Sequence, residues 1–367
     1  MFFNLKPLPS FPLLIIMAIS CFSLIILYSI GGGHFYPWCF NQLCRLAVGV
    51  IVLLAAYNIK LDIWKKYGYT FYLFCFIMLG AVAIVGKVSM GAQRWLNFGF
   101  FNFQPSELMR IFLVIVLAKY FSTHSVDENR KTKTLLVPIV LTLAPLGLVL
   151  LQPDLGTALL LFFVFCSILF VCGVQIWKFI AVLISIAISA PILWNNLHEY
   201  QRQRILMFIS PEMDPNGAGY HIIQSQIALG SGGFWGKGLM QGSQSQLNFL
   251  PEKQTDFVFA ALGEEMGFVG CIILLAFYGI LLTYNLRVAM RVRSKFDQIL
   301  VFGLNAMLFF YIFINVSMVC GLLPVVGIPL PFFSYGGSAL SVLMFCQGII
   351  FAADYEQRSK TSFKKRS

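Results

Sequence analysis

Apolar runs of about twenty residues recur along the whole chain, and this repetition constrains its fold more than any other feature. An α-helix rises about 1.5 Å per residue, so roughly 20 apolar residues cross a hydrocarbon layer of about 30 Å. Hydrophobic residues make up 59% of the 367 residues and charged residues only 11%. The sequence therefore predicts an all-α integral membrane protein, a single polytopic domain over 1–367 with ten transmembrane helices. The runs lie at 12–31, 43–58, 69–86, 106–121, 134–152, 155–175, 177–195, 257–286, 298–320 and 335–353.

The lysines and arginines are distributed unevenly among the predicted loops. Most of the 26 fall near the N-terminus, in alternate loops and in a basic tail at about 354–367. Because loops that remain in the cytoplasm keep their positive charge, both termini are predicted to be cytoplasmic, in a multi-pass protein of the cytoplasmic membrane. The net charge of +11 then indicates contact with anionic membrane lipids, and we expect no nucleic acid partner.

Two outer segments have unusual compositions. The extracytoplasmic loop at about 196–256, between the seventh and eighth predicted spans, contains the glycine-rich stretch GSGGFWGKG at 230–238. Loops of this length are usually functional or disordered, and the aromatic residues in this one argue against disorder. The segment 321–337 has no charge, and it is too apolar for a solvated loop and too rich in Pro and Gly for a spanning helix. It is predicted to re-enter the membrane against protein and to wall a cavity.

Asp256 lies where the long outer loop meets the eighth apolar run, at the lip of the membrane core. A charge carried into hydrocarbon costs roughly 3 kcal/mol or more, and such groups usually face a wet cavity and serve function. The alternative role is an N-cap of the following helix, because Asp is a good N-cap residue. Glu264 and Glu265 follow in the same run. Three carboxylates at one helix entrance indicate a polar pocket and favour a functional Asp256.

Further polar residues lie near the other predicted outer helix ends. Glu107 and Arg110 are three residues apart on the fourth predicted helix, so they share one face and can neutralise each other. We favour a role for this pair in holding charge and geometry inside the bundle, with substrate contact as the alternative. Asp154 follows a proline and precedes a helix start, which is typical of an N-cap.

Five cations lie in the predicted outer loops: Arg94, Arg202, Arg204, Lys237 and Lys253. Cationic side chains bind phosphate through charge-assisted hydrogen bonds, and contact with lipid headgroups is the alternative. For Arg202 and Arg204 the two interpretations stay equally open. The histidines and cysteines have no spacing typical of metal ligands, so no protein metal site is predicted.

Five long motifs resemble those of the SEDS family, the shape, elongation, division and sporulation proteins. They are GAQRWLNFGFFNFQPSEL, QPDLGTALLL, NGAGYHIIQSQIALGSGGFWGKG, FLPEKQTDFVFAALGEE and GIPLPFFSYGGSAL. The stretches PEMDPNGAGYHIIQS, GSQSQLNFLPE and LLPVVGIPLPF are more similar to the elongation branch than to the division branch. The resemblance covers most of the chain. It implies ten spans and a peptidoglycan glycosyltransferase that polymerises lipid II at the outer membrane face during cell elongation.

The resemblance also assigns residues. The family's catalytic aspartate, in a TDF motif, falls on Asp256, which we expect to be the general base for the 4-hydroxyl of GlcNAc. The family's QPSE segment falls on Gln104 to Glu107, and Arg110 replaces the family's lysine. Because Arg keeps its proton, a role that needs a proton from this position is not expected. The residues predicted to contact substrate are Arg202, Arg204, Glu107, Arg110, Trp95, Lys253 and Gln104.

The partners implied by the resemblance are lipid II and a class B penicillin-binding protein transpeptidase, beside membrane lipids. No cofactor is predicted from protein ligands, while Mg²⁺ or another divalent cation held largely by substrate phosphates stays open. Two alternative functions remain: a flippase or transporter of the lipid-linked precursor, and a non-catalytic scaffold for the transpeptidase. The acidic residues cluster at the outer lip, not at the bilayer midplane, which favours the polymerase over a transporter.

Overall fold

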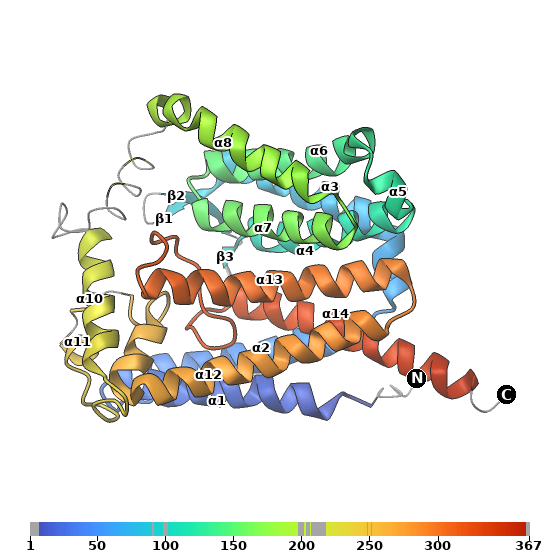
Figure 1. Ribbon diagram of the computed structural model, residues 1–367. Helices are drawn as coiled ribbons and strands as arrows, with labels where there is room; N and C mark the ends of the chain where they lie inside the picture. Colours follow the sequence, from blue (N-terminus) through green and yellow to red (C-terminus); the bar gives the residue numbers. More distant parts are fainter. Residues whose placement is uncertain are drawn as a thin grey trace.

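The computed structural model describes residues 7–89, 92–97, 102–196, 202, 206, 218–247, 249–250 and 252–364. Its long helices lie side by side along one common direction (Figure 1). Each of the ten apolar runs lies on one of these helices. They are α1 (Ser10–Ile30), α2 (Trp38–Asn58), α3 (Leu61–Val85), α4 (Pro105–Ser122), α6 (Thr132–Leu151), α7 (Leu155–Val171), α8 (Ile176–Asn196), α12 (Val258–Arg291), α13 (Lys295–Val319) and α14 (Ser338–Lys364).

Within the described residues, six helices have the length and apolar composition needed to cross a membrane, namely α1, α2, α6, α12, α13 and the 338–360 part of α14. Two further apolar helices, α7 and the 176–189 part of α8, are shorter. Helix α4 is different, because its 18 residues include Glu107, Arg110 and Lys119. Nearly all of its side chains are buried, so the charges of its first turns meet neighbouring helices and not lipid. The prediction of a helical membrane protein is confirmed.

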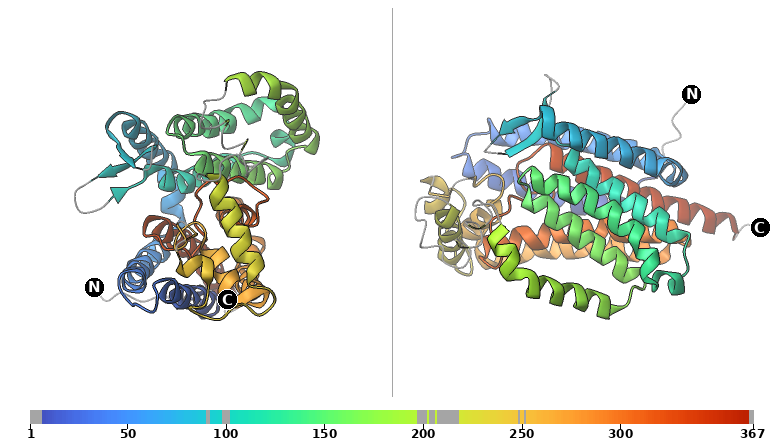
Figure 2. Two further views of the ribbon diagram at one scale, coloured as in Figure 1. Left: turned by 90° about the vertical axis from the view of Figure 1, so that its left-hand side faces the viewer. Right: turned by 90° about the horizontal axis from the view of Figure 1, so that it is seen from above.

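A small antiparallel sheet was not expected from the all-α prediction. Its strands are β1 (Lys87–Ser89), β2 (Ala92–Asn97) and β3 (Asn102–Phe103), in the order β1-β2-β3, with Lys87 opposite Trp95. The sheet projects from the helices at the end of α3 (Figure 2). Strands of two to six residues are too short for an alternating pattern to stand out, so they could not be predicted from the sequence. Short helices complete the described fold: α5 (Val126–Asn129), α10 (Ala218–Ser231) and α11 (Ser243–Gln246).

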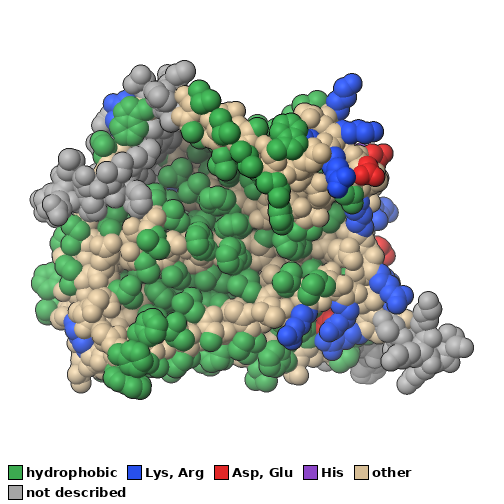
Figure 3. All heavy atoms as spheres, in the orientation of Figure 1, with side chains coloured by type: hydrophobic (Ala, Val, Ile, Leu, Met, Phe, Trp, Pro, Cys, Tyr) green, Lys and Arg blue, Asp and Glu red, His purple; other side chains and the backbone are tan. Residues whose placement is uncertain are grey.

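The two ends of the bundle differ in charge. Most lysine and arginine side chains visible in Figure 3 lie at one end, which also holds α5 and both chain termini (Figure 1). Helices α4, α7 and α12 begin at the opposite end, where α10, α11 and the sheet lie (Figure 1). We call this the α10 end. It collects the outer segments that the sequence singled out.

Small residues allow some helices to approach closely. A Cβ added to Gly348 of α14 would lie 2.4 Å from the carbonyl oxygen of Leu53 on α2, and Gly49 faces Met344 in the same way. Helices in membranes associate largely through such close packing, because lipid tails are as apolar as their side chains. The α2–α14 contact therefore fixes where α14 begins and where the segment before it enters the bundle.

The segment 320–337 between α13 and α14 is irregular and largely buried. Side chains from other helices satisfy its backbone: Asn315 donates to Ile328 O (2.7 Å), Gln42 donates to Ser334 O (3.1 Å), and Tyr278 donates to Pro331 O. Irregular backbone is tolerated at membrane depth only where protein supplies such partners. The prediction that this segment packs against protein is confirmed.

Candidate active site

Asp256 lies two residues before α12 and faces the irregular segment 320–337. A Cβ placed on Gly327 would lie 3.6 Å from the Asp256 Oδ2 atom. No described residue forms a hydrogen bond or an ion pair with this partly buried carboxylate. Burial, with a smaller repulsion from Glu252, raises the pKa of Asp256 to about 6. Such a carboxylate is mostly ionised at neutral pH and is still basic enough to accept a proton.

The alternative role of Asp256 as a helix cap is wrong. The N-cap residue of α12 is Phe257, and no side chain caps this helix end. The Asp256 carboxylate therefore keeps its full capacity to accept hydrogen bonds.

Hydrogen bonds hold the backbone around Asp256, whereas no described residue binds its carboxylate. Asn315 of α13 donates to the carbonyl oxygen of Asp256 (2.9 Å) and also to that of Ile328. The hydroxyl of Ser334 donates to Thr255 O (2.6 Å). These contacts hold the turn before α12 against the 320–337 segment, so the position of the carboxylate is set by three separate parts of the chain.

A second polar cluster lies at the starts of α4 and α7. Asp154 caps α7, because its Oδ1 accepts from Thr157 N (3.1 Å) and its Oδ2 accepts from the Thr157 hydroxyl (2.7 Å). The predicted N-cap is thus confirmed. Arg110 donates to the Thr157 hydroxyl, Gln104 donates to Asp154 Oδ2 (3.4 Å), and Arg94 lies 3.9 Å from Asp154 Oδ1. Arg110 and Asp154 are therefore joined through one threonine.

Glu107 lies in the same first turns of α4 and is buried with Arg110. Ser338, the first residue of α14, donates to Glu107 Oε1 (3.2 Å). The Arg110 guanidinium also lies over the ring of Tyr311, 5.3 Å from its centroid. The Glu107 and Arg110 side chains thus join α4 to α7, α13 and α14, and a structural role for this pair stays a prediction.

The 320–337 segment lies between the two clusters. A Cβ added to Gly156, two residues after Asp154, would lie 2.5 Å from Val326 O and 3.0 Å from the Ile328 side chain. The next residue after Val326 is the glycine beside Asp256. Only a residue without a side chain fits at position 156, so the backbone at 326–328 runs closely from the start of α7 to Asp256.

The prediction that Glu264 and Glu265 share one pocket with Asp256 is wrong, because their partners are different residues. Glu264 accepts from Lys237 Nζ (2.8 Å) and from Ser245 N (3.0 Å), and it is fully buried. Glu265 accepts from the hydroxyl of Ser29 on α1 (2.6 Å). The sequence placed the three carboxylates near one helix entrance but did not show that Lys237 and Ser29 bind two of them.

The glycine-rich loop at 230–238 closes a break inside α12. Gly267 has a φ of 64°, so the helix is interrupted there and its neighbouring backbone groups lose their helical partners. A Cβ on Gly267 would lie 2.3 Å from Gly236 N, which shows how closely the loop approaches. The loop supplies replacement partners in four backbone hydrogen bonds. In these, Lys237 N donates to Glu264 O, Gly238 N to Glu265 O, Phe268 N to Gly233 O and Val269 N to Phe234 O.

The predicted pyrophosphate contacts lie only partly within the described residues. Arg202 is described, and its guanidinium donates to Trp194 O (3.1 Å) and lies over the Trp194 ring. No described contact joins it to the surroundings of Asp256. Arg204 lies outside the described residues.

Lys253 and Trp95 lie on either side of the α10 end. Lys253, three residues before Asp256, donates to Ser245 O, and burial lowers its pKa. Trp95 lies on β2 beside Arg94 and is partly buried. No described contact brings Trp95 to Asp256, so its substrate role stays a prediction.

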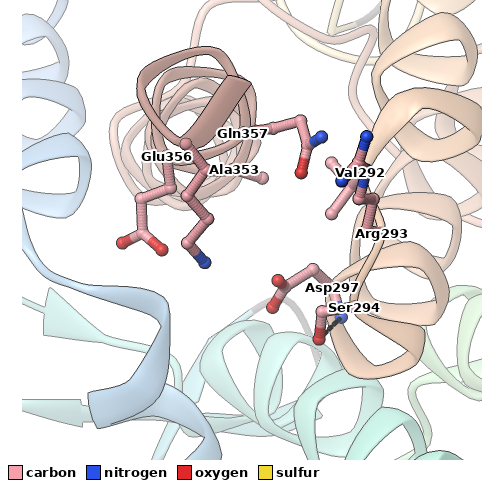
Figure 4. A pocket seen from close by; sticks show the side chains of 8 residues that line it. Val292, Arg293, Ser294, Asp297, Ala353, Glu356 and Gln357 are labelled. Atoms are coloured by element: carbon pink, nitrogen blue, oxygen red, sulfur yellow. Dashed lines mark hydrogen bonds between the residues drawn. The ribbon is translucent and has the colours of Figure 1, made fainter. Parts of the chain in front are cut away.

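Two cavities are present whose linings do not include Asp256. An apolar groove of about 330 Å³ runs between α12 and α13, lined by Leu275, Tyr278, Gly279, Leu282, Phe309, Ile312, Phe313, Val316 and Ser317. A smaller pocket of about 120 Å³ lies at the basic end of the bundle, between α14 and the α12–α13 corner, and the carboxyl groups of Asp297 and Glu356 flank it (Figure 4). The smaller pocket thus lies at the opposite end of the bundle from Asp256 and cannot take part in chemistry there.

Three residues that were not predicted from the sequence hold the surroundings of Asp256, namely Asn315, Gln42 and Ser334. Asn315 offered a signal, because it is an amide inside the apolar run 298–320 and such groups need partners in a membrane. Gln42 and Ser334 lie at the ends of apolar runs, where polar residues are ordinary, and only their contacts reveal the role.

The comparisons with known proteins agree with this geometry. The model of the FtsW, RodA and SpoVE family, described as "Cell cycle protein", matches residues 7–359. The chain belongs to the SEDS family. It is similar to the peptidoglycan glycosyltransferase MrdB of Escherichia coli (strain K12), with 43% identity over 342 residues, which cover 93% of this chain and 91% of MrdB. A probable peptidoglycan glycosyltransferase FtsW of Geobacter sp. (strain M18) is 34% identical over 94% of this chain and 96% of its own length.

This SEDS chain is similar to the solved structure of RodA. The crystal structure of Thermus thermophilus rod shape determining protein RodA has a TM-score of 0.72 and 25% identity, and covers 96% of this chain and 99% of RodA. A chain from the structure "Structural coordination of polymerization and crosslinking by a peptidoglycan synthase complex" has a TM-score of 0.83 and 28% identity. The match covers 95% of this chain and 98% of that chain. Together with the higher identity to MrdB than to FtsW, these likenesses confirm the predicted elongation branch.

Proposed function

We propose that this SEDS protein is a peptidoglycan glycosyltransferase that polymerises lipid II during cell elongation, with Asp256 as its general base. One observation carries the proposal: a carboxylate with a pKa of about 6 and no protein partner, on a backbone clamped against a buried irregular segment. A carboxylate with only a structural role would have a donor or a cation beside it.

The reaction follows from this placement. Asp256 accepts the proton of the acceptor 4-hydroxyl as the hydroxyl oxygen forms a bond to the anomeric carbon of the donor sugar. The bond between that carbon and the pyrophosphate oxygen breaks, and its electron pair leaves with polyprenyl pyrophosphate. A direct displacement of this kind inverts the anomeric carbon. General base catalysis of this type contributes about 10²–10⁴-fold in rate.

The Glu107, Arg110 and Asp154 cluster has a supporting role in this proposal. Asp154 and Thr157 fix the start of α7, and Glu107 binds the first residue of α14 through Ser338. The cluster therefore sets the spacing between the helices on either side of the 320–337 segment. Gln104 belongs to it through its contact with Asp154.

The membrane arrangement is part of the proposal. Ten helices would span the bilayer, both termini would lie in the cytoplasm, and the α10 end with Asp256 would face outward. The gathering of lysine and arginine at the end that holds both termini supports this orientation (Figure 3). The apolar groove between α12 and α13 offers a place for part of a polyprenyl chain.

The partner is proposed to be a class B penicillin-binding protein transpeptidase, which would crosslink the glycan. A similar solved structure concerns the coordination of polymerization and crosslinking in a peptidoglycan synthase complex, which supports this pairing. Arg202, Arg204, Lys253 and Trp95 stay as predicted substrate contacts. Among the described residues no group of three or more His, Cys, Asp or Glu side chains could hold a metal ion, so a divalent cation would rely mainly on substrate phosphates.

The test uses the purified full chain in liposomes with labelled lipid II, with and without the transpeptidase partner. The proposal predicts glycan polymer from the native chain. Movement of lipid II across the bilayer without polymer would identify a flippase. Polymer formed only by other added enzymes would identify a scaffold.

A further inference from the structure

Arg45 of α2 is a further cation near the outer segments. It lies seven residues into a helix that begins at Trp38, at the α10 end. Its guanidinium carbon lies 3.9 Å from the centroid of the Tyr335 ring, and the side chain is partly buried. No described residue accepts a hydrogen bond from it or pairs with it ionically. The ring stabilises the charge but leaves the five N–H donors of the guanidinium unused.

Tyr335 is a fixed platform for this guanidinium. Its backbone N donates to Gln254 O (2.8 Å), its hydroxyl lies 3.4 Å from Asn41 Nδ2, and the Trp38 ring meets it edge-on at 4.9 Å. Gln254 is two residues from Asp256. The arginine is thus joined through a single aromatic residue to the turn that carries the proposed base.

Four other outer cations differ from Arg45, because each has a protein acceptor, although the Nε of Arg202 has none. Arg94, Arg202, Lys237 and Lys253 each donate to at least one protein oxygen. Arg45 does not, although a partly desolvated guanidinium needs hydrogen-bond acceptors. Its free donors fit an acceptor that arrives from outside the protein.

The two residues that follow Tyr335, Gly336 and Gly337, have no side chains. A Cβ added to Gly336 would meet no atom within 4 Å, and one added to Gly337 would lie 3.5 Å from the Cδ and Nε atoms of Arg45. Gly337 thus lies against the Arg45 side chain, and neither glycine adds a side chain beside it. A tetrahedral anion could approach the donors there without a steric barrier from positions 336 and 337.

We propose that Arg45, supported on Tyr335, binds a phosphate of the lipid-linked pyrophosphate. This inference rests on the proposed glycosyltransferase function and adds a substrate contact to its site. The planar fork of a guanidinium matches two phosphate oxygens, which an ammonium cannot do. The cation then neutralises charge on the pyrophosphate close to the turn that carries Asp256.

The test measures binding without turnover. Fluorescent lipid II is titrated into the full chain carrying Asp256→Asn, alone or with Arg45→Gln, Arg45→Lys or Tyr335→Leu. Loss of a charge-assisted contact to phosphate predicts at least about tenfold weaker binding for Arg45→Gln and for Tyr335→Leu, with Arg45→Lys intermediate. Arg287→Gln is the matched control, because this exposed arginine lies on α12 at the opposite end. It should bind as the parent does.

Competition identifies the chemistry that Arg45 recognises. Polyprenyl pyrophosphate should compete with lipid II less well after Arg45→Gln, whereas a polyprenol without phosphate should compete equally before and after. The proposal is overturned if Arg45→Gln leaves lipid II affinity unchanged, or if it weakens polyprenol to the same extent. It is also overturned if phosphatidylglycerol vesicles or inorganic pyrophosphate compete as well as polyprenyl pyrophosphate, since the site would then bind any headgroup or a free anion.

The two proposals fail separately. If the chain with native Asp256 makes no polymer while Arg45→Gln still loses pyrophosphate-dependent binding, the polymerase function fails and the lipid pyrophosphate site stands. If polymer forms normally and Arg45→Gln binds lipid II with parental affinity, the function stands and the role of Arg45 is wrong. Thermal unfolding of each variant, compared with its parent, separates lost binding from lost folding.

Discussion

The pH dependence of glycan polymerisation should follow the titration of Asp256. The ordinary pKa of this group is 3.8, and burial with repulsion from Glu252 raises it to about 6. A general base works only when ionised, so kcat/KM should be constant well above pH 6 and should reach half its plateau near about pH 6. Below the pKa it should fall about tenfold per pH unit, to about one tenth of the plateau near pH 5.

A single substitution should move this midpoint. Glu252 lies on the exposed turn before α12, and its negative charge raises the pKa of Asp256. Glu252→Gln removes the repulsion, so the pKa falls and the midpoint moves to lower pH. The shift will be modest because the larger cause, burial, remains. Asp297→Asn is the control, since this buried carboxyl lies in the first turn of α13, which begins at the opposite end of the bundle (Figure 1).

The assay is initial-rate polymerisation of labelled lipid II at low substrate concentration, from about pH 4.5 to pH 8.5. The reasoning is refuted if the rate stays flat below pH 5. It is equally refuted if Glu252→Gln leaves the midpoint in place, or if Asp297→Asn moves it as much.

The same structure predicts effects on stability. A carboxyl whose pKa is raised in the folded state holds its proton better there, so stability declines as pH rises from about 3.8 to about 6 and then stays low. Asp256→Asn should therefore stabilise the fold by about 2 kcal/mol at neutral pH, seen as a higher unfolding temperature, and an unchanged temperature would contradict the burial of this charge. Gly267→Ala should destabilise by about 2 kcal/mol or more, because φ is positive and the loop backbone leaves no room for a methyl group. Gly279→Ala on the same helix meets open space and should be neutral or slightly stabilising, so equal effects at the two positions would disprove the helix break. Asn315→Ala removes the donor to two carbonyl oxygens and should lower the free energy of unfolding by about 1–3 kcal/mol, measured by chemical denaturation. Polymerisation should fall as well, and normal activity would show that these hydrogen bonds are not needed to position Asp256.

The helices were predictable because the apolar runs are long and nearly continuous, and each of them lies on a helix of the structure. The start of α7 was predictable for a similar local reason, since Asp154 in QPDLGT has the sequence of an N-cap. The buried irregular segment at 320–337 could be inferred from its lack of charge together with its Pro and Gly content. These features depend on neighbours in sequence.

Features that depend on distant residues could not be predicted in this way. Glu264 and Glu265 lie close to Asp256 in sequence, yet Lys237 binds Glu264, and Ser29 on the first helix binds Glu265. The Arg45–Tyr335 stack joins residues nearly three hundred positions apart. No pattern within one segment encodes such pairs, because they arise only when helices and loops are packed together.

The most direct measurement of the central claim compares lipid II binding and polymerisation by the native chain and by Asp256→Asn in the same preparation. Asn keeps the size of the side chain and removes only the base. The account predicts that the variant binds lipid II as the native chain does and forms no detectable glycan polymer. Polymer formed by Asp256→Asn at the native rate would contradict the account.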